Sequence, residues 1–212
     1  MIFKDRKDAA KKLVKAILQD KGLSDLLKKN HNFFIVSLLR GGVVLGNIIS
    51  KQLKIKHLPL PSIKIPAPSN PELAIGAFCF DKTYIEKGVI DSMAIDNKEI
   101  SQQATKTREK FKSYCKEFKL RKTIYEKIKN KMVLLVDDGI ATGATIKAAT
   151  RFLRSLKPGL LILIVPVAPL GFETKDFDKT IILHKNPCFS SVSQFYEYFP
   201  QVENFEVKKL LN

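Results

Sequence analysis

The stretch VLLVDDGIATGATIKAAT, from Val133 to Thr150, predicts a strand, a turn and a helix, with its chemistry concentrated in the turn. Its first four residues are aliphatic, as in a strand that is buried on both faces of a sheet. Asp137 and Asp138 follow at once, and a helix is expected over residues 144–156. At the end of a parallel strand, such a turn lies in the crevice where open α/β sheets bind ligands.

The turn combines groups suited to a phosphate with groups suited to hydroxyls. Gly139 and Gly143 let the backbone turn tightly and approach an anion. The N–H groups at the helix start, with the hydroxyls of Thr142 and Thr145, would hold a phosphate. The two acids are repelled by that phosphate, so they are expected to meet hydroxyl groups or a divalent cation beside it. A ligand with a phosphate next to a sugar diol meets both requirements.

Other nucleotide-binding motifs do not match the spacing of this turn. Walker A requires GxxxxGK[ST], whereas only three residues separate Gly139 from Gly143 and no Lys follows. The GxGxxG pattern of dinucleotide-binding folds is also absent from the stretch. A plainer alternative is that Asp138 caps a helix and the glycines merely turn the chain.

A hydrophobic strand, two acids and then TGxT closely resemble the phosphoribosyl-pyrophosphate (PRPP) signature of type I phosphoribosyltransferases. The resemblance implies transfer of the 5-phosphoribosyl group of Mg²⁺-PRPP to a nitrogenous base, with release of pyrophosphate. It does not fix the base, although a purine is expected ahead of a pyrimidine. Asp137 and Asp138 would then be the catalytic residues, and they would also hold Mg²⁺, directly or through water. The loop for the 5-phosphate would consist of Gly139, Ala141, Thr142, Gly143, Ala144 and Thr145.

A second strand, turn and helix is predicted near the start of the chain. The run FFIVSLL, residues 33–39, is followed by Arg40, Gly41 and Gly42 and then by a helix near 43–54. Two anion-binding turns in one crevice suit a ligand with phosphates at both ends. In the family that the chain resembles, this turn binds pyrophosphate, and a basic residue nearby assists it; Lys64 is the candidate.

Strands that alternate with helices predict a doubly wound, mostly parallel sheet flanked by helices, as in type I phosphoribosyltransferases. Residues 58–65 and 160–167 are further expected strands. The whole chain, 1–212, is predicted to form one domain with a Lys-rich helical insertion near 97–130.

The C-terminal segment near 186–212 is rich in aromatic residues. Aromatic clusters usually close a hydrophobic core, but this one is also a candidate hood over a planar base, with Phe189 and Tyr196 as its stacking residues. This segment and KIPAPSNPELAIGA, residues 64–77, resemble a subgroup of predicted bacterial phosphoribosyltransferases whose substrate is unsettled.

Sequence composition narrows the cellular location and the kinds of metal or disulfide site that are expected. No apolar run approaches the ~20 residues of a membrane helix, and the charged start MIFKDRKDAAKK is unlike a signal peptide, so a cytoplasmic location is expected. The three cysteines are far apart and lack CxxC spacing, which argues against a zinc site or a disulfide framework. The expected partners are PRPP and a small-molecule base, in a role in nucleotide salvage; family members often form homodimers.

The net charge of +16 leaves a second class of function open. A positive field favours a polyanionic substrate such as PRPP, but it also favours nucleic acid. The alternative is therefore a non-catalytic regulator that senses PRPP and binds RNA or DNA, although no DNA-binding module is recognisable at either end. A hydrolase acting on a phosphorylated sugar is a third possibility.

Overall fold

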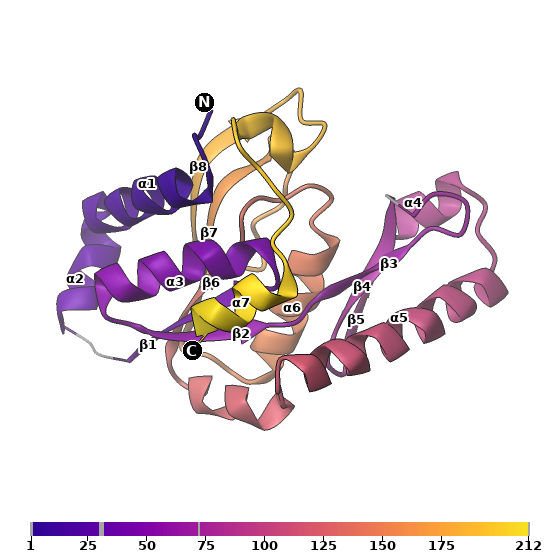
Figure 1. The fold of residues 1–212 in the computed structure, drawn as a ribbon, viewed down its shortest axis with the longest axis horizontal. Helices are drawn as coiled ribbons and strands as arrows, with labels where there is room; N and C mark the ends of the chain where they lie inside the picture. The colour runs from indigo at the N-terminus through magenta and orange to yellow at the C-terminus, as the bar shows by residue number, and fades with distance from the viewer. Residues whose placement is uncertain (1, 30–31, 72, 212) are drawn as a thin grey trace. The chain divides into compact units, whose positions relative to one another are not determined.

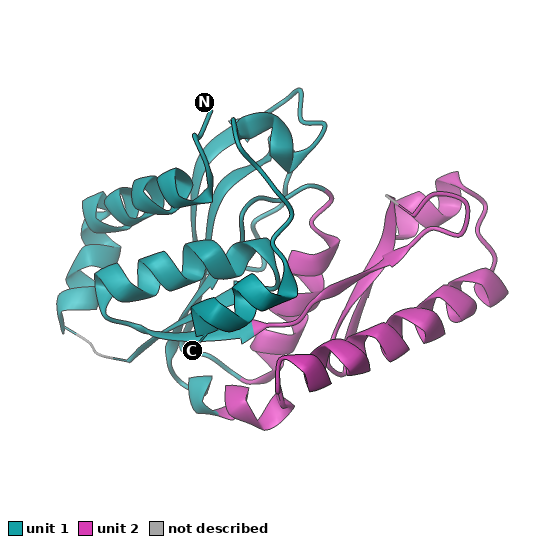
Figure 2. Cartoon of the chain, viewed as in Figure 1, with its two compact units in different colours: residues 1–59, 127–141, 157–212 teal, residues 60–126, 142–156 magenta. Residues whose placement is uncertain are grey.

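The structure is a computed structural model that describes residues 2–29, 32–71 and 73–211. The chain packs as two compact units, and Figure 2 shows them in different colours. The first unit comprises residues 1–59, 127–141 and 157–212, and the second comprises residues 60–126 and 142–156. The boundary at 141–142 therefore falls inside the turn with which the sequence analysis began. The prediction of one domain with an insertion and a hood stays a prediction.

The first unit is built on a five-stranded sheet flanked by helices (Figure 1). The strands are β1 (Phe33–Leu38), β2 (Lys56–Leu60), β6 (Met132–Val136), β7 (Leu160–Pro169) and β8 (Lys179–Asn186), in the order β2-β1-β6-β7-β8. The helices are α1 (Arg6–Gln19), α2 (Lys21–Lys29), α3 (Gly41–Leu53) and α7 (Asn204–Leu211), with the short 3-10 helix η2 (Val192–Phe195).

The central strands run parallel, which confirms the predicted fold class. β1 pairs with β6, β6 with β7, and β7 with β8, all in parallel register. Ser37 lies opposite Val136, so β1 and β6 end at the same edge of the sheet. The turns that follow the two strands therefore begin side by side at that edge.

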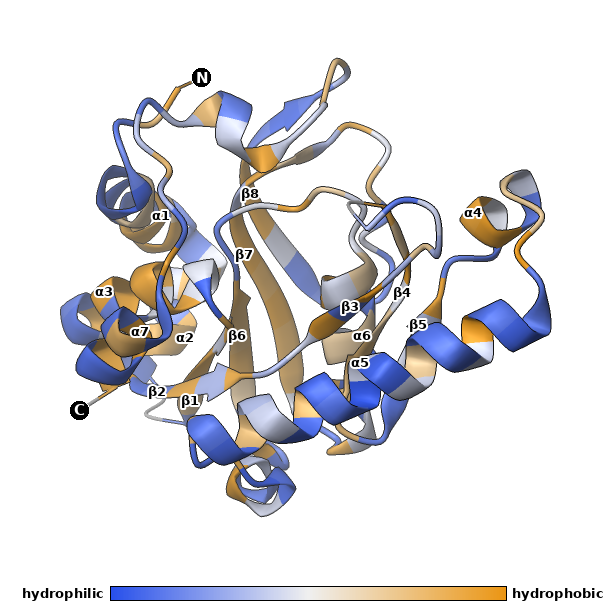
Figure 3. Ribbon diagram, turned by 45° about the vertical axis from the view of Figure 1, so that its right-hand side comes forward, coloured by the Kyte–Doolittle hydropathy of each residue, from blue (hydrophilic) through white to orange (hydrophobic). Residues whose placement is uncertain are grey.

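Continuous apolar runs produce the buried strands of this sheet. Every residue of β1 and β6 is buried, and Figure 3 shows the hydrophobic colouring of β6 and β7. The face of the sheet formed by Ile35, Leu134 and Ile162 belongs to one core cluster with the apolar side of α1. Burial of apolar surface contributes roughly 25 cal/mol per Å² to the stability of the folded state, so this core stabilises the strands whose ends form the sheet edge.

The second unit has its own sheet and its own core. Its strands are β3 (Ile63–Pro66), β4 (Ala74–Cys79) and β5 (Lys82–Ile85), which form an antiparallel sheet in the order β3-β4-β5. Its helices are α4 (Lys87–Ser92), α5 (Asn97–Glu117) and α6 (Ala144–Ser155), and the 3-10 helix η1 (Lys122–Ile128) begins in this unit. Phe80, Phe111, Tyr125 and Phe152 pack their rings together at its centre.

Residues 58–65 differ from the sequence-based expectation. The single strand predicted there is two strands, because Pro61 and Ser62 separate β2 from β3. Pro61 cannot donate a hydrogen bond to a neighbouring strand, so the ladder stops. The two strands then join different sheets. The helices predicted at 43–54, 97–130 and 144–156 correspond to α3, α5 and α6 within a few residues, with 97–130 ending in η1.

Candidate active site

Two glycines bring the turn after β1 into direct contact with the two acids that follow β6. A Cβ atom added to Gly41 would overlap the carboxylate of Asp138. A Cβ added to Gly42 would lie 2.8 Å from Asp137 Oδ1 and 3.0 Å from the Val136 carbonyl oxygen. Only glycine allows the backbone this approach. The structure thus brings together four residues that the sequence assigned to two separate turns.

Arg40 precedes these glycines and is joined to its neighbour Leu39 by a cis peptide bond. Its guanidinium lies 3.7 Å from Glu203 Oε2 and donates a long hydrogen bond of 3.4 Å to Asn204 Oδ1 at the start of α7. About a quarter of the Arg40 side chain is exposed. A partly exposed ion pair of this length is weak, so a stronger anion can replace Glu203.

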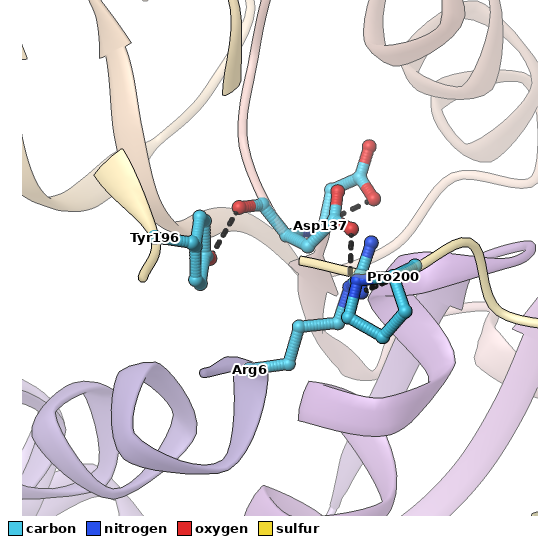
Figure 4. A network of polar contacts seen from close by, with 5 residues as sticks. Arg6, Asp137, Tyr196 and Pro200 are labelled. Carbon is cyan, nitrogen blue, oxygen red and sulfur yellow. Dashed lines mark hydrogen bonds and ion pairs between the residues drawn. The ribbon is translucent and has the colours of Figure 1, made fainter. Parts of the chain in front are cut away.

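Asp138 is held by residues that are far from it in the sequence, Arg6 and Tyr196, both of which are labelled in Figure 4. The Arg6 Nε donates to Asp138 Oδ2 at 2.8 Å, and the Tyr196 hydroxyl donates to the Asp138 backbone carbonyl at 2.6 Å. The Asp138 backbone N–H donates to Asp137 Oδ1 at 2.9 Å. These bonds fix both the main chain and the side chain at this position.

The environment raises the pKa of both acids. Burial and the charge of Asp138 raise the pKa of Asp137 well above its usual range. Burial also raises the pKa of Asp138, and the adjacent Arg6 guanidinium opposes that rise. Two neighbouring acids of this kind gain from a cation or from hydroxyl donors, which stabilise their charged forms.

Gly139 and Ile140 leave the strand edge in a direction set by packing. A Cβ on Gly139 would lie 2.5 Å from Val192 Cγ1 and 2.8 Å from Val167 Cγ2. The Ile140 N–H donates to the Val167 carbonyl at 2.9 Å, so this amide is already satisfied by β7. Close packing therefore explains the glycine at 139, and its predicted contact with phosphate stays a prediction.

The remainder of the predicted phosphate loop lies in the second unit, apart from the exposed Ala141. Gly143 has φ 80°, a conformation that glycine adopts readily, and α6 begins at Ala144. The Ala144 N–H reaches Thr142 Oγ1 only at 3.5 Å, and the Ser62 hydroxyl donates to the Thr145 carbonyl at 2.9 Å. The first N–H groups of a helix have no partner within the helix, so this start can receive an anion.

Lys64 also belongs to the second unit. It lies on β3 opposite Ala77 of β4, and its side chain is exposed. Its predicted role at the pyrophosphate stays a prediction.

The two predicted hood residues have different surroundings. The Tyr196 ring is 7% exposed and packs between Phe3, at 5.4 Å between ring centroids, and Phe199, at 4.6 Å. Its burial makes it a support for Asp138. Phe189 is half-buried and packs on Phe195 at 5.1 Å. Stacking of a base on either ring stays a prediction.

The sequence did not single out Arg6, whose side chain forms an ion pair with the Asp138 carboxylate. It stands among lysines in RKDAAKK at the start of an amphipathic helix, a pattern typical of a solvated residue. The available signal was its position on the same helical face as Ala10, Leu13 and Ile17, which are buried.

Asp137 and Asp138 can supply only part of the ligand shell of a magnesium ion. Among the described residues, no three His, Cys, Asp or Glu side chains are grouped to hold a metal. Mg²⁺ is often bound through one or two carboxylates, while waters and substrate oxygens complete its shell. Asp137 and Asp138 fit that smaller role, because a bound cation would offset the cost of keeping two neighbouring negative charges buried.

Comparison with known proteins identifies the family. The model of the phosphoribosyl transferase domain matches residues 4–182. The chain belongs to this family. Two strains of Mycobacterium tuberculosis each have a protein named "Putative phosphoribosyl transferase" that is 28% identical over the full chain. The chain spans 46% of the length of these relatives.

A solved structure supports the same fold for this phosphoribosyl transferase domain. The crystal structure of the protein TT1426 from Thermus thermophilus is 26% identical in sequence and has a TM-score of 0.70. The similarity covers 100% of this chain and 98% of that one. Within the described residues, no helix is both long and apolar enough to cross a membrane.

Proposed function

We propose that this phosphoribosyl transferase domain moves the 5-phosphoribosyl group of Mg²⁺-PRPP to a nitrogenous base and releases pyrophosphate. One observation carries the proposal: the backbone of the Gly41–Gly42 turn lies against the carboxylates of Asp137 and Asp138. An anion-binding turn and a pair of acids at one sheet edge suit a ligand whose pyrophosphate is attached beside a sugar diol.

Each group would then have a chemical task that suits its surroundings. Arg40, with the Gly41 and Gly42 amides and Lys64, would bind the pyrophosphate and neutralise its charge as it leaves. Asp137 and Asp138 would accept hydrogen bonds from the ribose hydroxyls. Their negative charge would also stabilise the positive charge that develops on the sugar ring in the transition state.

The 5-phosphate of the ligand would be held by the residues from Ala141 to Thr145. Thr142 and Thr145 would add hydroxyl donors to the N–H groups at the start of α6. Gly143 supports this role, because its positive φ turns the chain directly into the helix.

Mg²⁺ would bind with PRPP and would be held on the protein side by Asp137 and Asp138, directly or through water. When bound, the ion supplies positive charge that polarises the phosphate oxygens. The raised pKa of Asp137 supports this proposal, because a Mg²⁺ ion that arrives with PRPP would supply the positive charge that favours the ionised carboxylate.

The proposed acceptor is a purine, covered by the aromatic hood near Phe189. A purine offers the larger flat surface to an aromatic ring, and stacking favours such surfaces. The two Mycobacterium tuberculosis relatives are named as transferases, so the alternative of a PRPP sensor that binds nucleic acid gains no support from them.

The test is release of pyrophosphate from PRPP and Mg²⁺ in the presence of single purine and pyrimidine bases. We expect release with a purine only, and none when Mg²⁺ is chelated. Release with a pyrimidine only would overturn the choice of acceptor. No release with any base, although PRPP binds, would overturn the transferase activity.

A further inference from the structure

Arg6 is a buried cation that is fixed from several directions. It is 8% exposed, and its Nε donates to Asp138 Oδ2 at 2.8 Å. Its Nη1 donates to the Pro200 carbonyl at 2.7 Å (Figure 4). Its Cζ lies 3.7 Å from the centre of the Phe199 ring. Two hydrogen bonds set the plane of the guanidinium, and the aromatic ring covers one of its faces.

The helix that carries Arg6 does not depend on this contact for its anchoring. Ala9, Leu13 and Ile17 of α1 are fully buried in the core. The Asp5 side chain caps the helix by accepting from the Asp8 N–H at 2.8 Å. Burying an arginine has a large desolvation cost, so its placement here needs a reason other than helix packing.

The effect of Arg6 is concentrated on one oxygen of Asp138. The Cβ that Gly41 lacks would meet that same oxygen, and it would lie 3.2 Å from Arg6 Nε. The carboxylate is therefore enclosed between the guanidinium on one side and the Gly41 backbone on the other. Because Oδ2 is engaged by Arg6 and faces Gly41, a ligand would meet the carboxylate at Oδ1.

We infer that Arg6 is a positioning residue: it fixes Asp138 through Oδ2 so that Oδ1 is presented to a ribose hydroxyl. The inference rests on the proposed function for the identity of the ligand. Arg6 does not touch the reacting atoms in this account, and it acts through Asp138 alone.

The first test compares Arg6→Gln and Arg6→Lys with Lys7→Gln, a change at the next residue of α1, whose side chain is exposed. Steady-state pyrophosphate release would be measured for each variant, with melting curves to check folding. We expect kcat to fall on the order of a hundredfold for Arg6→Gln and roughly tenfold for Arg6→Lys, because small misplacements of a catalytic group have large effects on rate. KM for PRPP should change less than about threefold, since the phosphate-binding groups are untouched. Lys7→Gln should behave as the wild type.

A double-mutant cycle separates positioning from a general loss of structure. If Arg6 acts only through Asp138, the variant with both Arg6→Gln and Asp138→Asn should be no slower than Asp138→Asn alone. Additive losses would overturn the inference. Wild-type kcat in both Arg6 variants would also overturn it, and the proposed transferase activity would stand.

A readout without ligand keeps the inference testable if the wild type proves inactive. Crystal structures of the wild type and of Arg6→Gln would show whether the Asp138 carboxylate turns away from its place beside Gly41. A rotated carboxylate supports the positioning role, and an unchanged one overturns it. Inactivity of the wild type with all bases would overturn the proposed function alone.

Discussion

The turn after β1 and the turn after β6 have the same architecture, but they use glycine for different reasons. In the first, Gly41 and Gly42 are required because the acids of the other turn approach too closely for a Cβ. In the second, Gly143 is required by its own backbone, which has φ 80°. The first requirement comes from tertiary contact and the second from local conformation.

This difference means that the first turn cannot be understood from its own sequence. The glycines of Arg40-Gly41-Gly42 complement Asp137 and Asp138, which come almost a hundred residues later in the chain. A substitution in Gly41 or Gly42 should therefore displace the acids, and a substitution of an acid should change the tolerance for a larger residue at the glycines. Within the second turn, Gly143 should respond to substitution independently of this contact, because its requirement is local.

The largest effect is expected for Asp138→Asn, which removes a charge from the centre of the contact. We expect turnover to fall roughly a thousandfold, since the carboxylate is proposed to stabilise the transition state. The loss of the ion pair with Arg6 should lower stability by about 2 kcal/mol while the fold is retained. Pyrophosphate release and circular dichroism would measure the two effects. Near-normal turnover would show that the acid does not have the assigned role.

A smaller effect is expected for Gly41→Ala, which adds the Cβ that overlaps the Asp138 carboxylate. The displaced backbone should weaken PRPP binding by on the order of a hundredfold, as measured by calorimetry. The melting temperature should also fall.

The interdependence of the turns can be tested in a second background. When Asp138 is already alanine, Gly41→Ala should have little further effect on stability, because the overlapping atoms are gone. Gly143→Ala should destabilise equally in both backgrounds, by about 1–2 kcal/mol. An equal loss for Gly41→Ala in both backgrounds would refute the proposed dependence.

The stability of the packing between β1 and α3, the elements on either side of the first turn, is expected to depend on pH through His57. Its Nε2 lies 2.6 Å from Ser37 Oγ of β1, and a Cβ on Gly46 of α3 would meet the same nitrogen at 2.6 Å. Burial lowers the pKa of His57 to about 4. His57 of the unfolded chain therefore binds a proton at higher pH than His57 of the folded protein. The contribution of His57 to the stability of the folded state is present above about pH 6.5 and is lost as the pH falls from there towards 4.

Denaturant unfolding at pH 7 and pH 5 would measure this dependence. We expect His57 to account for about 2 kcal/mol of lost stability between the two values. The difference between wild type and His57→Gln isolates this contribution from the acids, whose raised pKa values act in the opposite direction. Parallel pH profiles for the two proteins would contradict the prediction.

The smallest effect is expected in the second turn, for Thr142→Val. The change removes one hydroxyl from the proposed phosphate grip, and Thr142 is exposed in the free protein. PRPP should bind about tenfold more weakly by calorimetry, with no change in melting temperature. Thr142→Ser, which keeps the hydroxyl, is the matched control. Equal affinity in the valine variant would count against the assignment of the loop.

The parts of the fold that the sequence predicted are those set by local pattern. Uninterrupted apolar runs identified β1, β6 and β7, and the residues after two of them marked the sheet edge where the ligand is proposed to bind. The convergence of Gly41 with Asp138 followed from the rule that parallel strands end at one edge. Such features depend on short stretches and on topology alone.

The features of the structure that the sequence did not predict depend on contacts between residues far apart in the chain. Residues 58–65 have the composition of one strand, and only the separate sheets divide it at Pro61. Arg6 has the pattern of a surface residue, and its burial results from Asp138, Phe199 and Pro200 closing around it. Its place on the apolar face of α1 was a local signal of burial, but no local pattern identifies these three partners.

The pairing of the chain's two ends around Asp138 has a consequence for biosynthesis. The Phe3 N–H donates to the Phe195 carbonyl, and Arg6 donates to the Pro200 carbonyl across 194 positions of sequence. At 5–20 residues per second, a ribosome needs roughly 10–40 s to travel that distance. During this interval the nascent chain carries Arg6 before the residues that enclose it exist. The surroundings of Asp138 are therefore completed only after Pro200 has been made, when all five strands of the supporting sheet already exist.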